Sequence, residues 1–124
     1  MRLFVLLTVL SLGLPAAAQA DVIRCTFTEP FISMTYSMTQ SSIEVVTPDG
    51  NETIASISFQ ILGPGQFALW DAAEAALVTL SLDYRGSDGM SDTIFPYSAL
   101  RAGEGGEQHG GCWSNHLPRV GGEQ

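Results

Sequence analysis

Short stretches in which apolar and polar residues alternate constrain the fold of this chain more than any other feature. Four stretches show the pattern clearly: residues 23–27, 32–38, 53–62 and 76–84. In residues 53–62, for example, Ile57, Phe59 and Ile61 are separated by single polar residues. Side chains two residues apart share one face of a β-strand, so each stretch is predicted to be a strand with one buried face.

Turn-forming residues separate these stretches at intervals of about ten residues. The sequence Pro48-Asp49-Gly50-Asn51 predicts a hairpin, and Gly63-Pro64-Gly65 predicts another tight connection. Weaker strand candidates fill the remaining intervals: residues 42–47, 66–70, 93–101 and 111–117. We therefore predict an all-β fold, a small antiparallel β-barrel or sandwich of about eight short strands.

Four segments depart from the alternation. Residues 71–76 begin with a D-x-x-E capping pattern and predict about one turn of helix between two strands. Pro96 cannot donate a ladder hydrogen bond, so its strand is predicted to lie at an edge or to carry a bulge. Residues 103–111 are rich in glycine and predict a mobile loop, and residues 118–124 predict a frayed tail.

Residues 1–20 have the three parts of a Sec-type signal peptide: Arg2, an apolar stretch from Leu3 to Leu14, and the small residues Ala18-Gln19-Ala20. Cleavage is expected before Asp21, which leaves residues 21–124 as a single β domain. The apolar stretch is too short to span a bilayer. We therefore expect a periplasmic or secreted protein that is not inserted in a membrane.

Cys25 and Cys112 are the only two cysteines in the sequence. Thiols are oxidised in the periplasm and outside the cell, so an exported chain with two cysteines is expected to pair them. The predicted disulfide between Cys25 and Cys112 ties the first strand to the last.

The charge of the chain is strongly acidic. Without Arg2, four arginines face thirteen acidic residues, a formal charge of −9, and there is no lysine. An acidic surface repels nucleic-acid phosphates and anionic lipid headgroups, so we expect no nucleic-acid partner and no membrane partner. Solubility alone accounts for such a charge. If the protein binds a partner, we expect a cationic envelope or extracellular protein. The protein itself is expected to be a monomer.

Residues 87–92, Ser-Asp-Gly-Met-Ser-Asp, form the most distinctive loop candidate. Asp88 and Gly89 predict a tight turn, because aspartate accepts hydrogen bonds from nearby amides and glycine tolerates a positive φ. Met90 is expected to fold back and plug the end of the barrel. Asp83, Asp88 and Asp92 supply carboxylates, but their spacing does not fit an EF-hand calcium loop. An aspartate-rich structural loop is the simpler interpretation, so no metal ligand is assigned.

A second candidate cluster is formed by His109, Cys112 and His116. Three ligands, one of them expected in a disulfide, do not make a structural zinc site. Both histidines are predicted to be exposed loop residues, a poor setting for a general base, and no serine lies in a G-x-S-x-G elbow. We expect no catalytic residue and no cofactor. Trp113 is expected to pack over the disulfide.

Three short segments, Ser87–Asp92, Pro96-Tyr97 and Gly111-Cys112, carry a resemblance. Together with Glu29-Pro30-Phe31, which is similar to an N-E-P-F segment, they resemble an uncharacterised family of small bacterial envelope proteins, often labelled predicted membrane proteins or lipoproteins. The family often has a cysteine where this chain has Gly86, so the resemblance implies Cys25 as the partner of Cys112. It implies compartment and domain identity, because the family has no established activity.

Loops concentrate function on β scaffolds, so the distinctive loop and its expected neighbours are the predicted binding surface. Its candidate residues are Asp88, Met90, Asp92, Glu29, Phe31 and Trp113. We predict a non-enzymatic protein- or ligand-binding module of the bacterial envelope, with a metal-binding periplasmic protein as one alternative. The other is a lysozyme-inhibitor-like protein that binds a cationic hydrolase. A small acidic barrel with one disulfide is similar to the C-type lysozyme inhibitors, although their lysine-bearing inhibitory motif is absent.

Overall fold

A computed structural model of the chain describes residues 22–28, 30–103 and 106–117. The expected signal peptide, the expected tail at 118–124 and the candidate residue Glu29 lie outside the described residues. The described part contains nine strands and no helix, so it also holds no helix that could span a membrane. The strands are β1 (Val22–Phe27), β2 (Ile32–Ser37), β3 (Ser42–Thr47), β4 (Gly50–Ala55), β5 (Ser58–Gly63), β6 (Gln66–Trp70), β7 (Ala76–Gly86), β8 (Phe95–Gly103) and β9 (Gly106–Ser114).

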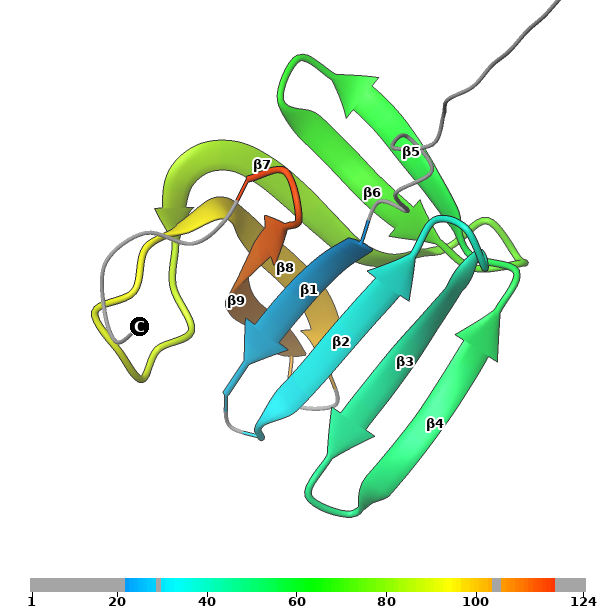
Figure 1. Cartoon of the computed structure of the whole chain (residues 1–124), viewed down its shortest axis with the longest axis horizontal. Coiled ribbons are helices and arrows are strands. Elements are labelled where there is room, and N and C mark those ends of the chain that lie inside the picture. The colour runs from blue at the N-terminus through cyan, green and yellow to red at the C-terminus, as the bar shows by residue number, and fades with distance from the viewer. Residues whose placement is uncertain (1–21, 29, 104–105, 118–124) are drawn as a thin grey trace, which may run out of the picture.

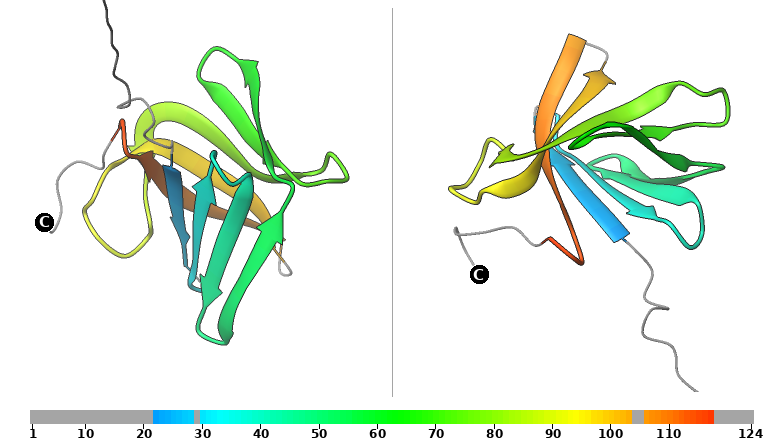
Figure 2. Two further views of the ribbon diagram at one scale, coloured as in Figure 1. Left: turned by 45° about the vertical axis from the view of Figure 1, so that its right-hand side comes forward. Right: turned by 90° about the horizontal axis from the view of Figure 1, so that it is seen from above.

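All nine described strands belong to one antiparallel sheet in the order β4-β3-β2-β1-β9-β8-β7-β6-β5. The sheet curls into a half-barrel, with β1, β9 and β8 in the middle and the two outer groups of strands as its wings (Figures 1 and 2). This confirms the predicted all-β antiparallel fold, with nine described strands where about eight were expected. The barrel is not closed, because β4 and β5 do not pair.

The main core lies on the concave face of the half-barrel. Alternation predicted its first two strands correctly: Ile23, Cys25 and Phe27 of β1 are buried, and so are the alternate residues of β2. Inward-facing residues of the other strands, and Ile57 between β4 and β5, complete the cluster: Ile43, Ile57, Leu69, Val78, Leu80, Ala99 and Cys112. Burial of these side chains on one face favours curling, because a flat sheet would leave that face in water.

The stretch 53–62, predicted as one strand, is two strands at opposite edges of the sheet. β4 ends at Ala55 and β5 begins at Ser58, and Ser56 between them has a φ of 62°. Ile57 is 2% exposed, and its backbone N–H donates to the carbonyl oxygen of Ser41 (2.9 Å). The alternation continues through the break, so periodicity alone did not reveal the corner. This corner carries the chain from one wing of the half-barrel to the other.

Residues 71–75 form a turn, and the predicted helical turn is wrong. The Asp71 side chain does cap this segment, since its Oδ1 accepts from the backbone N–H groups of Ala73 (2.9 Å) and Ala75 (3.0 Å). Glu74 has a φ of 65°, outside the right-handed helical region. The two ends of the turn are also closed by a backbone hydrogen bond from Asp71 to Ala75 (2.9 Å).

Two predictions about the last strands needed correction. Residues 106–111 of the glycine-rich segment are not a loop, because β9 begins at Gly106 and pairs with β8. Pro96 lies in β8, a central strand, and is fully buried, so the edge alternative is wrong. The other alternative, a bulge, is found at this position but on the neighbouring strand, because β7 has three residues between Leu82 and Gly86 where β8 has only Pro96 between Phe95 and Tyr97. The pairing of β7 with β8 shifts between Leu82 and Gly86, opposite the proline that cannot donate to the ladder.

Candidate functional site

The predicted disulfide is present in the middle of the sheet. Cys25 of β1 and Cys112 of β9 are register partners with Cα atoms 4.0 Å apart, and their sulfur atoms are bonded. Both side chains lie in the core at 2% and 0% exposure. Since β1 and β9 are distant in sequence, the bond fixes the pairing on which both wings of the sheet depend.

A second, smaller apolar cluster lies on the opposite face of the sheet, around Phe95. Its ring packs directly on Gly111, where an added Cβ would lie 2.6 Å from Phe95 Cγ. Trp113, two residues further along β9, packs on the same ring with centroids 5.3 Å apart. The prediction that Trp113 covers the disulfide is therefore wrong. Adjacent residues of a strand point to opposite faces, so Trp113 and Cys112 face different sides.

The loop between β7 and β8, residues 87–94 (Figure 1), ends at Phe95, the centre of this second cluster. Asp88 is 9% exposed, and its Oδ1 accepts from the backbone N–H groups of Met90 (2.8 Å) and Ser91 (2.9 Å). The Ser91 hydroxyl donates to Asp88 Oδ2 (3.1 Å) and accepts from the Thr93 backbone N–H (3.2 Å). The predicted aspartate-centred turn is confirmed, and the network fixes the backbone of the loop.

Asp88 is held in its charged form by this network. Burial by itself would raise the pKa of the carboxyl. The hydrogen bonds from the Met90 and Ser91 amides and from the Ser91 hydroxyl outweigh burial, so the pKa lies below its usual value of 3.8. The folded state thus favours the carboxylate.

Replacing Asp88 by asparagine is expected to lower the free energy of unfolding at pH 7 by about 1–2 kcal/mol, because charge-assisted hydrogen bonds become neutral ones. A folded pKa below the unfolded one contributes stability above about pH 4, and that contribution is lost as the pH falls through the lowered pKa. Urea unfolding between about pH 5 and pH 2 should therefore show a weaker acid dependence for Asp88→Asn than for wild type. Asp92→Asn, in the same loop but exposed, is the control, and equal acid dependence in wild type and Asp88→Asn would contradict the assignment.

Met90 projects into solvent from this ordered loop. Its side chain is 60% exposed, so the prediction that it plugs the barrel is wrong. The apolar anchor of the loop is instead Phe95, which is 1% exposed. Ile94 (46% exposed) and Asp92 are also on the surface. The loop therefore displays an apolar side chain next to a carboxylate on a fixed backbone.

The turn between β1 and β2 lies against this loop. An added Cβ at Gly89 would lie 2.9 Å from Thr28 Oγ1, so the loop and the turn are in close contact. Phe31 in the same turn is 40% exposed. The structure thus brings the candidate loop residues Asp88, Met90 and Asp92 to the same end of the sheet as Phe31. Trp113, by contrast, packs on Phe95.

Gln108 and Arg101 hold that turn in place, and sequence reasoning missed both. Gln108 is 9% exposed, and its Nε2 donates to the carbonyl oxygens of Thr28 (2.6 Å) and Pro30 (2.8 Å). Arg101 donates to Gln108 Oε1 and lies over the Phe27 ring, with Cζ 5.7 Å from the centroid. Gln108 lies in the glycine-rich segment expected to be a loop, so no pattern marked it as buried.

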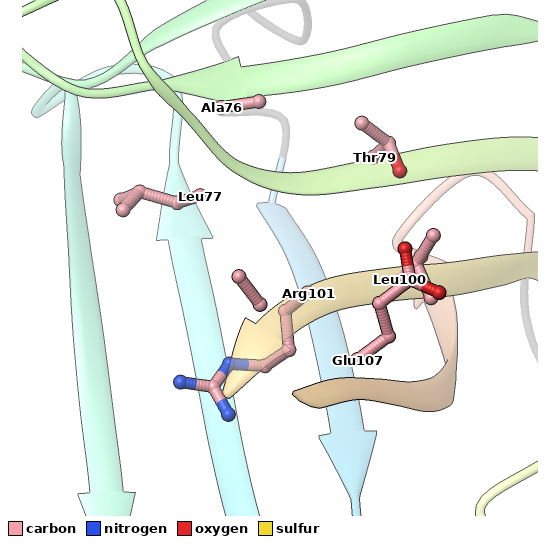
Figure 3. A pocket seen from close by; sticks show the side chains of 7 residues that line it. Ala76, Leu77, Thr79, Leu100, Arg101 and Glu107 are labelled. Carbon is pink, nitrogen blue, oxygen red and sulfur yellow. The ribbon is translucent and has the colours of Figure 1, made fainter. Parts of the chain in front are cut away.

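A shallow pocket of about 150 Å³, with Arg101 in its lining, lies over β7, β8 and the start of β9 (Figure 3). Small-molecule sites in proteins are usually clefts of about 300–1,000 Å³. The pocket is lined by Ala76, Leu77, Thr79, Leu100, Arg101, Ala102 and Glu107. It is therefore small for an organic ligand and is not assigned as the functional site.

The candidate metal ligands considered from the sequence do not form a site in the part of the chain that the structure describes. Within residues 22–28, 30–103 and 106–117, no group of three His, Cys, Asp or Glu side chains could hold a metal ion. His109 is exposed, as predicted, but lies on strand β9 rather than in a loop. His116 is exposed just after β9.

No protein-family model, curated protein or solved structure matches this chain. The interpretation of the loop surface therefore depends on its own geometry.

Proposed function

We propose that the protein is an exported, non-enzymatic binding module of the bacterial envelope. Its proposed binding surface is formed by residues 87–94 together with Thr28, Pro30 and Phe31 of the adjoining turn. The observation that carries the proposal is Met90, held 60% exposed on a loop whose backbone is fixed by Asp88. An exposed methionine on an ordered loop is a side chain without a packing role in the monomer.

The physical chemistry of such a loop favours binding. Methionine is flexible and polarisable, and it adapts to apolar pockets of a partner. A loop that is already ordered loses little conformational entropy when it binds, which favours affinity. The internal hydrogen bonds of Asp88 and Ser91 supply that order before any partner arrives.

Charge points to a cationic partner protein. The chain carries a formal charge of −8 at pH 7, and Asp92 is exposed beside Met90. Opposite charge on a partner accelerates encounter and orients it, whereas the apolar contact supplies most of the affinity. The partner we infer has an apolar pocket with basic residues around it.

Replacing Met90 by serine is expected to weaken capture of a partner at least about tenfold, since burial of one large apolar side chain contributes about 1.5–3 kcal/mol. The measurement is quantitative affinity capture from an envelope extract, with the mature protein as bait. Met38→Ser is the matched control, because Met38 is another exposed methionine, at 38%, in the turn after β2. The proposal predicts at least one captured protein that wild type and Met38→Ser retain and that Met90→Ser loses. If the capture yields no such protein, the proposal is wrong.

A cationic hydrolase of the lysozyme type is the second candidate partner, and the acidic charge is the observation that favours it. Binding of this type should weaken as salt increases, because salt screens exposed charges. Gel filtration of the mature protein with lysozyme at low ionic strength tests it directly. Absence of a complex there would remove this candidate and leave the broader proposal to the capture experiment.

A further inference from the structure

The two edges of the half-barrel sheet are protected very differently. β4 carries Glu52, whose register partner Val45 packs against the core, so a carboxylate stands on the concave side of that edge. Charges placed this way discourage pairing with another strand. β5 reads SFQILG, with neither charge nor proline, and its Ile61 and Leu62 are 72% and 54% exposed.

The outer edge of β5 is open among the described residues. β5 pairs only with β6 there, and it stands last in the strand order. Such an edge presents backbone N–H and C=O groups to solvent, which is a template for pairing with a further strand. Neither a charge nor a proline in β5 blocks that pairing, and the shift in its register with β6 falls at Leu62, which leaves Ser58 to Ile61 regularly paired.

The hairpin that forms this edge also carries no charge. No charged residue occurs between Glu52 and Asp71, a stretch that includes all of β5 and β6. Two copies of a chain with a formal charge of −8 repel each other over most of their surface. The β5–β6 hairpin is the part of the surface where a second copy meets the least repulsion.

We propose that β5 pairs antiparallel with β5 of a second copy of this chain, about a two-fold axis. With Gln60 opposite its counterpart, Ile61 lies opposite Phe59 of the second copy, on the concave face. Phe59 is half-buried and stacks on Phe67 with centroids 5.3 Å apart. The pairing therefore places Ile61, which is largely exposed in the monomer, against Phe59 of the second copy. It also joins the two sheets into one.

A second copy fits this edge better than a foreign strand does. A basic peptide would find no carboxylate on the hairpin, and an acidic peptide would be repelled by the whole molecule. An uncharged apolar strand fits, and β5 itself is one. A two-fold symmetric pair of β5 strands also stops at two copies, because the only remaining edges of the described sheets are the two β4 strands, which carry Glu52 and stay unpaired. This inference departs from the monomer expected from the sequence and does not depend on the proposed role of the 87–94 loop.

Sedimentation velocity of the mature protein, at concentrations up to about 1 mM, tests the proposal, since a single strand pair makes a small and weak interface. We expect the mass to double with increasing concentration for wild type. Ile61→Lys is expected to remain monomeric throughout, because a lysine on an edge strand opposes pairing. Met38→Lys makes the same charge change at an exposed apolar residue away from β5 and should dimerise like wild type.

Hydrogen exchange gives a second readout that does not require a variant. Protection of β5 amides should rise with protein concentration, while protection of β4 amides should not. A wild-type protein that is monomeric at every concentration would overturn the proposal. So would a dimer that Ile61→Lys leaves intact, or growth into larger oligomers, which requires β4 to pair as well.

Discussion

Replacing Cys25 and Cys112 together by alanine is expected to lower the free energy of unfolding by about 4 kcal/mol. The disulfide closes a loop with a sequence separation of 87 residues, and the loss of chain entropy in the unfolded state grows with that length. Domains of this size are stable by only about 5–15 kcal/mol, so much of the total would be lost. Urea unfolding of residues 21–124 measures the change.

The strand pair that the disulfide cross-links explains why a large loss of stability is expected. Every other strand pair in the described sheet joins strands that are consecutive in sequence, whereas β1–β9 joins the first to the last. Reduced wild-type protein is the control, because it keeps both sulfur atoms in the core and removes only the cross-link. If reduction costs less than about 1 kcal/mol, packing rather than the cross-link accounts for any effect of the alanine variant.

Replacing Gly86 by alanine is expected to cost about 3 kcal/mol, at the upper end of what overpacking usually costs. An added Cβ there would overlap the carbonyl oxygen of Tyr97 and lie 2.9 Å from Phe95 Cβ. The backbone of β8 cannot move away easily, because β8 is paired on both sides. The cost is measured by urea unfolding, as for the disulfide variant.

Gly63→Ala is the matched control for this prediction. Gly63 ends the edge strand β5, and an added Cβ there would meet no atom within 4 Å. Its effect is expected to stay within about 0.5 kcal/mol. Equal effects of the two alanine variants would show that loss of glycine flexibility, and not the contact with β8, is responsible.

The sequence predicted those parts of the fold that depend on local patterns. Alternation located β1 and β2 because each has one face in the core and one outside, and proline and glycine located the β3–β4 and β5–β6 hairpins. Alternation failed at residues 53–62, since apolar and polar residues alternate in the sequence from Ala55 to Ile61, whereas the core-facing positions shift from Ile54 to Ile57 at the corner that sends the chain to the other edge. The loop predicted from glycine content was wrong for residues 106–111, because glycines that look flexible are required there by close packing, as at Gly110 beneath the Phe27 ring.

The candidate site was predictable only in its backbone. Asp88 and Gly89 signalled a turn through their own chemistry, which needs no distant contact. The direction of Met90 depended on which side chain fills the space near β9, and that is Phe95, a residue with no distinguishing pattern. The carbonyls that Gln108 binds lie 78 and 80 residues away along the chain, so the anchoring of the turn at Thr28 and Pro30 could not be seen in the sequence.

The strand order has a consequence for the topology of the chain. Followed from β5 across the sheet, the order is β5 to β9 and then β1 to β4, with every strand next to its successor. The sheet is therefore a circularly permuted simple meander. The corner at Ser56 and Ile57 joins the two edge strands, β4 and β5, whereas the neighbouring strands β9 and β1 have no direct connection along the chain. Val22 and Asn115, at the ends of those two strands, are already joined by a hydrogen bond from the Val22 backbone N–H to Asn115 Oδ1 (3.1 Å).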